Sequence, residues 1–429
     1  MARALGLDFG TTNTVLALAD AGGGTHSMPF ESSVGVSDSM RTALSFMKEG
    51  RSTQSLRVEA GQAAIRLFID HPGDCRFLQS IKTFAASSAF QATQIFARRH
   101  SFEDLMEVFL HRLQAYAGAA WPAEISQLVV GRPVRFAGGN PDEALAMQRY
   151  QAALARFGFP AIHYVYEPVA AAYYFAQTLS RDATVLVADF GGGTTDYSLI
   201  RFERHAGELR AMPIGQSGVG IAGDHFDYRL IDNLVAPEIG KGSQFKSFDK
   251  LLDLPASYFA SFGRWNQLSI FKTTREFTDL KSLVRVATEP EKLKLFVDLI
   301  DYDEGYPLYQ AISATKMALS TADEAEFVFP PLGKAGRKMV KRADFEAWIA
   351  EDLARIEDAL DEVLAETKTP VGEIDKVFLT GGTSFVPAVR DIFTRRFDAG
   401  RIESGGELLS IAHGLALIGE SGDVERWAA

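Results

Sequence analysis

Two stretches of this chain, residues 5–18 and 185–200, repeat one unusual pattern. The first reads LGLDFGTTNTVLAL and the second reads VLVADFGGGTTDYSLI. In both, an apolar run meets a turn of Asp, Gly and Thr and continues as a second apolar or alternating run, which predicts a β-hairpin. Glycine lets a backbone approach an anion closely, and consecutive turn N–H groups form a concavity that binds anions. One such turn would be ordinary, but two in one chain predict a duplicated phosphate clamp and therefore nucleotide binding.

Each turn carries candidate phosphate contacts together with a carboxylate at the end of the strand. Asp8 stands at the end of the first strand and Asp189 at the end of the second. Since a carboxylate repels phosphate, we expect a hydrated divalent cation between the two. The turn residues expected near the phosphates are Gly10, Thr11, Thr12 and Asn13 in the first hairpin, and Gly191, Gly192, Gly193 and Thr194 in the second.

The bulk properties narrow the class of protein. A chain of 429 residues is too long for one simple core and indicates two or more domains. The net charge of −11 argues against general binding to nucleic acid or to an anionic membrane. Strand-like sequence begins by Leu5, so we expect no signal peptide, and no apolar run approaches the roughly 20 residues that span a bilayer. Cys75 is the only cysteine, which predicts neither an internal disulfide nor a thiolate metal cluster. These properties predict a cytoplasmic protein.

Strands alternate with helices along both halves of the chain, which predicts α/β architecture in each half. The expected elements of the first half are helices over 101–120 and 142–158, a strand over 127–133, and a strand followed by a small-residue helix over 163–177. Those of the second half are one long amphipathic helix over 342–368, a strand, Gly-Gly turn and helix over 376–393, and a last helix at 408–419.

Taken in order, these motifs resemble the actin-like ATPase superfamily. They are most similar to the nucleotide-binding domain of DnaK-type heat-shock chaperones, and within that class to the short YegD-like branch. The two hairpins resemble the family's phosphate loops, and RPVRF with YEPVAAAYYFA resembles its first connecting segment, which includes a proline switch at Pro133. FLTGGTSFVP resembles the adenosine motif and LLSIAHGLAL the second connecting helix. Five motifs in order are a strong signal, whereas a lone glycine turn is weak.

The resemblance implies a two-lobe fold of duplicated ribonuclease-H-like domains with a nucleotide cleft between the lobes. It implies lobe I over residues 1–180, with an inserted subdomain at about 38–110, and lobe II over 181–407, with an inserted subdomain at about 225–318. Residues 408–429 would form a C-terminal helix that returns to lobe I.

The implied ligands are ATP or ADP with Mg²⁺, and the resemblance assigns roles to matching residues. Asp8 and Asp189 would hold the metal through its waters. Lys82, in FLQSIKTFA, would reach the γ-phosphate and the attacking water, and a point charge on a long stem suits that role. Glu167 would orient water near the metal, and Thr194, with Thr11 and Thr12, would offer its hydroxyl and N–H to phosphate and water. Such groups would suffice for slow hydrolysis, because phosphoryl transfer depends mainly on positioning and charge neutralisation.

Three of these residues also have structural interpretations. A lysine picked without regard to the motifs is most often a solvated surface residue, and this is the structural interpretation of Lys82. Glu167 would be an ordinary carboxylate at a helix N-terminus. Asp196 would either belong to the metal shell or hydrogen-bond its own turn.

The adenosine side is where the sequence departs from the family. Outside the hairpins, the resemblance places Gly223 and Asp224 in a further small loop near the phosphates, and the remaining implied contacts are Lys316, Met317, Ser320, Gly381, Gly382 and Phe385. Met317 and Phe385 stand where the family has arginines, and Ser313 stands in place of a glutamate. Apolar and aromatic faces can stack on a base, but without charge. The alternative is that both side chains pack into the core, and the sequence favours neither reading.

The family continues through a linker into a peptide-binding domain, whereas this sequence ends at Ala429. We therefore expect no intrinsic peptide-binding domain and a separate, unidentified protein partner that responds to lobe closure. Residues 225–310 show the weakest resemblance and are the expected partner region. The aromatic residues of that region, expected mainly in the core, are Phe245, Phe248, Tyr258, Phe259, Phe262 and Trp265.

Three functions fit the sequence. The first is a Mg²⁺-dependent, chaperone-like ATP-binding protein with weak ATPase activity. The second is a nucleotide-gated scaffold with little or no hydrolysis, which the lost arginines favour and the retained Lys82, Glu167 and paired aspartates disfavour. The third is a small-molecule kinase of the same superfamily, which needs a catalytic aspartate base for which the sequence offers no separate candidate.

Overall fold

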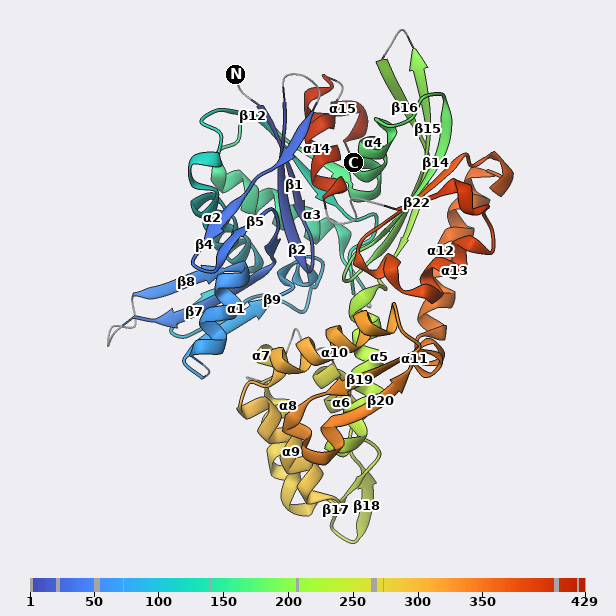
Figure 1. Cartoon of the computed structure of the whole chain (residues 1–429). Coiled ribbons are helices and arrows are strands. Elements are labelled where there is room, and N and C mark those ends of the chain that lie inside the picture. Colours follow the sequence, from blue (N-terminus) through green and yellow to red (C-terminus); the bar gives the residue numbers. More distant parts are fainter. Residues whose placement is uncertain are drawn as a thin grey trace. The chain divides into compact units, whose positions relative to one another are not determined.

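The computed structural model describes residues 3–20, 24–49, 55–71, 73–138, 140–205, 208–263, 268–272, 274–404, 409–422 and 424–428 (Figure 1). The chain divides into two compact units. The first consists of Met1–Leu67, Ser80–Gly223 and Leu353–Ala429, and the second of Phe68–Gln79 and Asp224–Asp352.

The first unit contains two mixed sheets with the same topology. One sheet has the order β13-β12-β1-β2-β3, with β6 also paired to β2, and the other has the order β22-β21-β14-β15-β16. Each begins with an antiparallel hairpin, β1–β2 or β14–β15, and adds two parallel strands on the side of its first strand. The strands of the first sheet are β1 (Arg3–Phe9), β2 (Asn13–Ala19), β3 (Thr25–Ser27), β6 (Met40–Arg41), β12 (Ile125–Arg132) and β13 (Ile162–Tyr166). Those of the second are β14 (Ala183–Phe190), β15 (Thr195–His205), β16 (Glu208–Val219), β21 (Lys376–Thr380) and β22 (Ile402–Ser404). The predicted duplication and the α/β fold class are confirmed.

Helices stand at equivalent positions along the chain relative to the parallel strands of the two sheets. The helices that precede, separate and follow the two parallel strands are α2 (Phe102–Ala117), α3 (Glu143–Leu154) and α4 (Glu167–Ala176) in the first sheet, and α12 (Ala350–Thr367), α13 (Pro387–Thr394) and α14 (Ser410–Glu420) in the second. The predicted helices and strands at these positions are confirmed, apart from the one over 342–368. That segment forms α11 (Arg342–Trp348) and α12, with a break at Ile349, whose φ of −95° and ψ of 2° are not helical. Periodicity missed the break because the buried Ile349 continues the apolar stripe across it.

Helices α4 and α14 pack against each other, α14 on strands of the first sheet and α4 on strands of both sheets (Figure 1). A Cβ atom at Gly414 would lie only 1.8 Å from the carbonyl oxygen of Ala170, so the two backbones touch where the helices cross. The small residues of α4, Ala170, Ala171 and Ala172, are fully buried and allow this approach. The joint core includes Phe175 and Phe378, whose rings stack at 4.2 Å, and thereby joins α4 to β21.

The remaining elements of the first unit are short. They are β4 (Phe30–Ser32), β5 (Gly35–Ser37), β7 (Ala43–Lys48), β8 (Leu56–Ala60), β10 (Thr93–Ile95), β11 (Arg98–His100) and α15 (Val424–Trp427). Helix α1 (Gly61–Asp70) begins in this unit, and the strand β9 (Cys75–Gln79) belongs to the second.

The second unit is mainly helical. Its helices are α5 (Gly223–Leu234, whose first residue belongs to the first unit), α6 (Ala256–Gly263), α7 (Leu268–Phe271), α8 (Arg275–Leu283), α9 (Pro290–Asp301), α10 (Gly305–Leu319) and α11. Its hairpins are β17 (Gln244–Ser247) with β18 (Lys250–Asp253), and β19 (Glu324–Val328) with β20 (Arg337–Lys341).

The expected core aromatics of this unit divide into two groups. Tyr258, Phe259 and Phe262 are buried, and the rings of Phe259 and Phe262 pack on Phe296. Phe248 is 95% exposed at the turn between β17 and β18, so the expectation was wrong for this residue. Phe245 is half-buried, and Trp265 lies outside the described residues.

Across the described ranges, no helix combines the length and the apolar character needed to cross a membrane. The lobe and subdomain boundaries implied by the resemblance stay predictions.

Candidate functional site

The two predicted phosphate turns approach each other in the first unit. Asp8 pairs with Val15 across β1 and β2, and Asp189 lies in register between Asp196 on β15 and Thr380 on β21. A Cβ atom at Gly193 would lie 3.5 Å from the Thr11 hydroxyl oxygen, so the second turn reaches the first. The structure therefore brings the two hairpins together at one site.

Each turn is held by a threonine that the sequence analysis missed. The Thr42 hydroxyl donates to the carbonyl oxygen of Gly10 at 2.7 Å, and the Thr383 hydroxyl donates to that of Gly191 at 3.2 Å. Thr42 also lies 2.9 Å from the Thr14 hydroxyl, and its N–H donates to the carbonyl of Thr12. Thr383 lies inside the GGTSF motif and was available as a signal, whereas nothing in the sequence around Thr42 marks it.

Lys82 and Glu167 form a buried ion pair beside the turns. Lys82 lies in a 3₁₀ helix, Ile81–Phe84, and Glu167 is the first residue of α4, followed by Pro168. The Lys82 ammonium donates to Glu167 Oε1 at 2.5 Å, with the two side chains 7% and 6% exposed. The interpretation of Lys82 as a solvated surface lysine is therefore wrong. Glu167 does occupy a helix N-terminus, and it faces a buried cation as well.

The carboxylates of this cluster carry more negative charge than Lys82 balances. Asp8, Glu167, Asp189 and Asp196 are all buried, as is Lys82. Burial raises the pKa of Asp8, the charge of Glu167 raises it further, and Lys82 opposes the rise. Burial, followed by the charges of Glu167, Asp196 and Asp8, raises the pKa of Asp189 well above its usual range.

Asp196 is the most deeply buried of the four and has an unexpected partner. Its Oδ1 accepts hydrogen bonds from the N–H groups of Val134 at 2.8 Å and Arg135 at 3.2 Å. These two bonds go to the segment directly after Pro133, while the Thr194 hydroxyl of the same turn also acts on the Asp196 carboxylate, so both interpretations of Asp196 stay predictions. Its buried Oδ2 has no hydrogen-bond partner of ordinary geometry within the described ranges. Burial and the charge of Glu167 raise the pKa of Asp196 to about 7, although the Thr194 hydroxyl lowers it.

This donor set fits a hydrated cation better than a directly ligated one. The described residues contain no group of three or more His, Cys, Asp or Glu side chains spaced to ligate a metal directly. Asp8 and Asp189 were predicted to act through water, which needs no such group. The excess of buried carboxylates and the raised pKa values are what a cation placed nearby would relieve.

Four predicted contacts lie in the second unit. Lys316 on α10 has its Nζ 2.6 Å from Oδ1 of Asp227 on α5, a partner that the sequence analysis missed. Burial and the charge of Asp227 raise the pKa of Asp224 to about 6, against the effect of Lys316. The Ser320 hydroxyl donates to the carbonyl of Lys316 at 3.1 Å, and Met317 lies on the same turn. The charges of Asp224, Asp227 and Lys316 therefore act on one another.

The residues predicted to lie on the adenosine side include two side chains that are too exposed to belong to the core. Gly381 follows β21 with a φ of 83°, and a Cβ atom there would lie 2.0 Å from the Phe190 carbonyl, so only glycine fits this close approach. Gly382 and Phe385 belong to the 3₁₀ turn that follows. Phe385 is 50% exposed and Met317 is 68% exposed, which excludes the alternative that they pack into the core.

Comparison with known proteins relates these features to one family. The model of the family described as Hsp70 protein matches residues 80–248 and 297–420. The match leaves out residues 1–79, which include the first hairpin, residues 421–429, and residues 249–296, which fall within the region of weakest resemblance, 225–310. Two curated relatives are named Chaperone protein DnaK, one from Deinococcus radiodurans and one from Deinococcus deserti. Each is 25% identical to this chain, over 416 and 405 residues, and the matches cover 91% of the chain and 55% of each relative. The chain therefore spans about half the length of these relatives.

Proposed function

The chain belongs to the Hsp70 family, and from this premise we propose that it binds ATP and ADP with Mg²⁺ and hydrolyses ATP slowly. Its output would be a chaperone-like closure of the nucleotide-binding lobes that a separate protein partner recognises. A cytoplasmic location is part of this proposal.

The observation that carries the proposal is the charge cluster beside the two turns. The turns supply backbone N–H groups and hydroxyls suited to phosphate oxygens, and Lys82 supplies a buried ammonium next to them. Asp8 and Asp189 are the residues that would hold Mg²⁺ through its waters. The bound ion would neutralise phosphate charge, which is the main requirement of phosphoryl transfer.

The protein's own groups would orient the reaction. Lys82 and Glu167 hold each other in one geometry, so the ammonium would be aimed before nucleotide binds. The Thr11 and Thr194 hydroxyls, both on largely buried residues, would meet phosphate oxygens or the attacking water. Glu167 would accept a hydrogen bond from that water and set its direction.

The test compares binding with a single turnover of ATP. We would measure ATP and ADP affinity by calorimetry, with and without Mg²⁺, and then single-turnover hydrolysis by the wild type, Lys82→Met and Asp189→Asn. Lys281→Met is the matched control, because Lys281 is exposed and pairs with Asp301 in the second unit. We expect slow hydrolysis by the wild type and the control. We expect Lys82→Met to bind ATP without hydrolysing it, and Asp189→Asn to lose the dependence of binding on Mg²⁺.

Two outcomes would count against the proposal. Absence of nucleotide binding by the folded wild type would refute it. Tight binding without turnover in any version would favour the second candidate, a nucleotide-gated scaffold. The observation that favours that candidate is the exposure of Met317 and Phe385, which stand where the family's charged arginines are expected.

A further inference from the structure

Helix α3 presents two consecutive buried residues, Arg149 and Tyr150, that have no role in the site described so far. Arg149 is 6% exposed and Tyr150 is fully buried. The guanidinium of Arg149 donates to four backbone carbonyls at 2.6–3.1 Å. These belong to Phe84, Ala85, Ser87 and Phe90. The guanidinium thus holds residues 84–90, a segment that begins at the end of the 3₁₀ helix that carries Lys82. Arg149 therefore fixes the backbone directly after Lys82.

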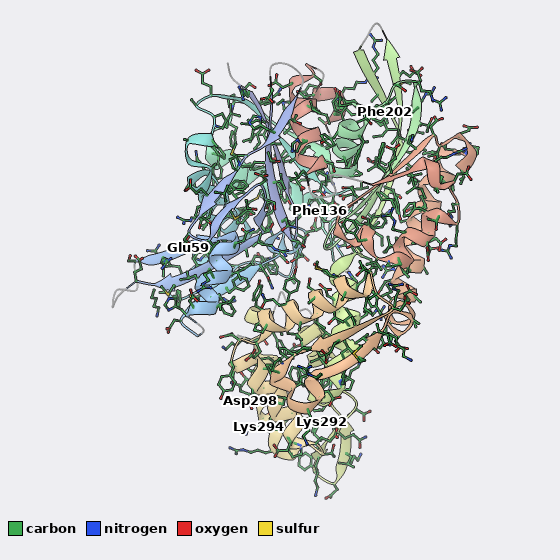
Figure 2. All side chains as sticks on the ribbon, viewed as in Figure 1. Glu59, Phe136, Phe202, Lys292, Lys294 and Asp298 are labelled. Atoms are coloured by element: carbon green, nitrogen blue, oxygen red, sulfur yellow. The ribbon has the colours of Figure 1, made fainter. Side chains whose placement is uncertain are left out.

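The ring of Tyr150 is held by aromatic contacts on three sides. It stacks on the ring of Phe102, with the ring centres 5.8 Å apart. It makes edge-on contacts with the rings of Phe9 and Phe136, whose centres lie 6.1 Å and 5.7 Å away (Figure 2 labels Phe136). Phe9 directly follows Asp8, and Phe136 follows the backbone N–H groups that Asp196 binds. The ring is thus fixed relative to the strand that carries Asp8 and to the segment that binds the Asp196 carboxylate.

The hydroxyl of Tyr150 is subject to the charges of the buried cluster. It is buried and, among the residues that the structure describes, no atom forms a hydrogen bond with it. Burial raises the pKa of Tyr150, and the charges that act on the hydroxyl include those of Lys82, Glu167 and Asp8. Buried hydroxyls almost always have a hydrogen-bond partner, so an unpaired one calls for an explanation. An ammonium has three N–H donors, and Lys82 directs one of them to Glu167.

We propose that Tyr150 is a positioning residue for Lys82: its hydroxyl oxygen accepts a hydrogen bond from the ammonium through one bridging water, which fixes the direction of the remaining N–H bond. Arg149 fixes the backbone of the same lysine from the neighbouring position of α3. The consequence for hydrolysis rests on the proposed function, whereas the link between Tyr150 and Lys82 is a property of the nucleotide-free protein.

The test uses Tyr150→Phe, which removes the hydroxyl and keeps the ring that packs on Phe102. Tyr164→Phe is the matched control, because the buried Tyr164 hydroxyl also has no hydrogen-bond partner within the described ranges, and the pKa of Tyr164 is raised by burial alone. In ¹⁵N-lysine-labelled, nucleotide-free protein, the Lys82 ammonium signal would be assigned by its loss in Lys82→Met. We expect hydrogen exchange of this ammonium with water to be roughly tenfold faster in Tyr150→Phe than in wild type, which is about the effect of losing one charge-assisted hydrogen bond.

The same variant should lose single-turnover hydrolysis by roughly tenfold without a change in ATP affinity, because one hydrogen bond that orients a charged group is lost. Tyr164→Phe should change neither quantity. A crystal structure of the nucleotide-free wild type should contain an ordered water within hydrogen-bond distance of both Tyr150 Oη and Lys82 Nζ.

Equal ammonium exchange in wild type and Tyr150→Phe, equal effects of the two substitutions, or absence of the bridging water would each overturn the inference. If wild type binds no nucleotide, the proposed function fails, while the exchange and crystallographic measurements still decide whether Tyr150 positions Lys82.

Discussion

Replacing Asp196 by asparagine should stabilise the protein at pH 8, although it removes a fully buried polar residue. Asparagine keeps an oxygen that can accept from the N–H groups of Val134 and Arg135, so both bonds to the segment after Pro133 can remain. What disappears is the negative charge, which lies beside Glu167 in a cluster that already has excess negative charge. The free energy of unfolding of the variant should therefore exceed that of the wild type.

The magnitude follows from the pKa of Asp196, which burial and Glu167 raise from 3.8 to about 7. Each pKa unit corresponds to about 1.4 kcal/mol, so ionisation of Asp196 at pH 8 costs the folded state about 4 kcal/mol relative to the unfolded chain. The asparagine N–H₂ replaces Oδ2, which has no partner of ordinary geometry among the described residues, and an unpaired buried donor costs about 1–3 kcal/mol. The net gain expected at pH 8 is about 1–3 kcal/mol.

The pH dependence has a definite sign. Between about pH 4 and pH 7 the folded state keeps a proton on Asp196 that the unfolded chain releases, so wild-type stability falls as pH rises through this window. Below pH 4 both states are protonated, and the advantage of asparagine vanishes. Urea unfolding at pH 8 and pH 4, without nucleotide or metal, measures the difference.

The matched control is Asp352→Asn. Asp352 is also buried, but both of its oxygens accept from the Arg229 guanidinium, at 2.8 and 3.0 Å. Its replacement should lower the stability at pH 8 by about 1–3 kcal/mol, because charge-assisted bonds are lost. If Asp196→Asn is as destabilising as this control at pH 8, or if its effect is the same at both pH values, the reasoning about excess negative charge is refuted.

Three further perturbations test the same packing and charge arguments. Lys82→Met should lower the free energy of unfolding by about 3–5 kcal/mol, since it leaves a buried carboxylate without its cation, whereas Glu167→Gln should cost less; equal losses in urea unfolding would contradict this asymmetry. Gly414→Ala should lower the melting temperature sharply or prevent folding, because the new Cβ would lie 1.8 Å from a backbone oxygen, while Gly372→Ala, with nothing within 4 Å of the new atom, should fold normally. Arg149→Met should lower the free energy of unfolding by several kcal/mol, roughly 1 kcal/mol for each of the four backbone hydrogen bonds that are lost. It should also speed proteolysis within residues 84–90, and unchanged cleavage there would show that the arginine is dispensable.

The sequence predicted the hairpins and most of the fold because their signals are local. Alternation of apolar residues around an Asp-Gly-Thr turn specifies both the strands and the bend, and the order of the strands and helices follows from the repetition of this unit. Periodicity could not reveal the break at Ile349, since one non-helical residue leaves the apolar stripe intact. The exposure of Phe248 was missed for a related reason, because hydrophobicity predicts burial only on average.

The site was predictable where a residue lies inside a repeated motif and unpredictable where its partner lies elsewhere. Burial of Lys82 depends on Glu167, which lies 85 residues further along the chain, and Asp196 reaches across to residues 134 and 135. Contacts of this kind depend on how β12, α4 and the hairpins pack, and no single window of sequence contains them.

The two turns show how a duplicated unit can be completed by supports that are not duplicated in the sequence. Thr42 precedes β7, whereas Thr383 follows β21, and yet each donates its hydroxyl to the carbonyl of the first glycine in its turn. An unpaired carbonyl oxygen in such a turn would repel a phosphate, and a carbonyl that already accepts a hydrogen bond is directed toward its donor. If both turns bind phosphate as proposed, both must keep this oxygen away from an anion, so the same hydrogen bond is needed twice, and any hydroxyl that the fold brings within reach can supply it. The repeat in the sequence therefore marks the groups that would face the ligand, while the groups that hold them emerge only from the folded chain.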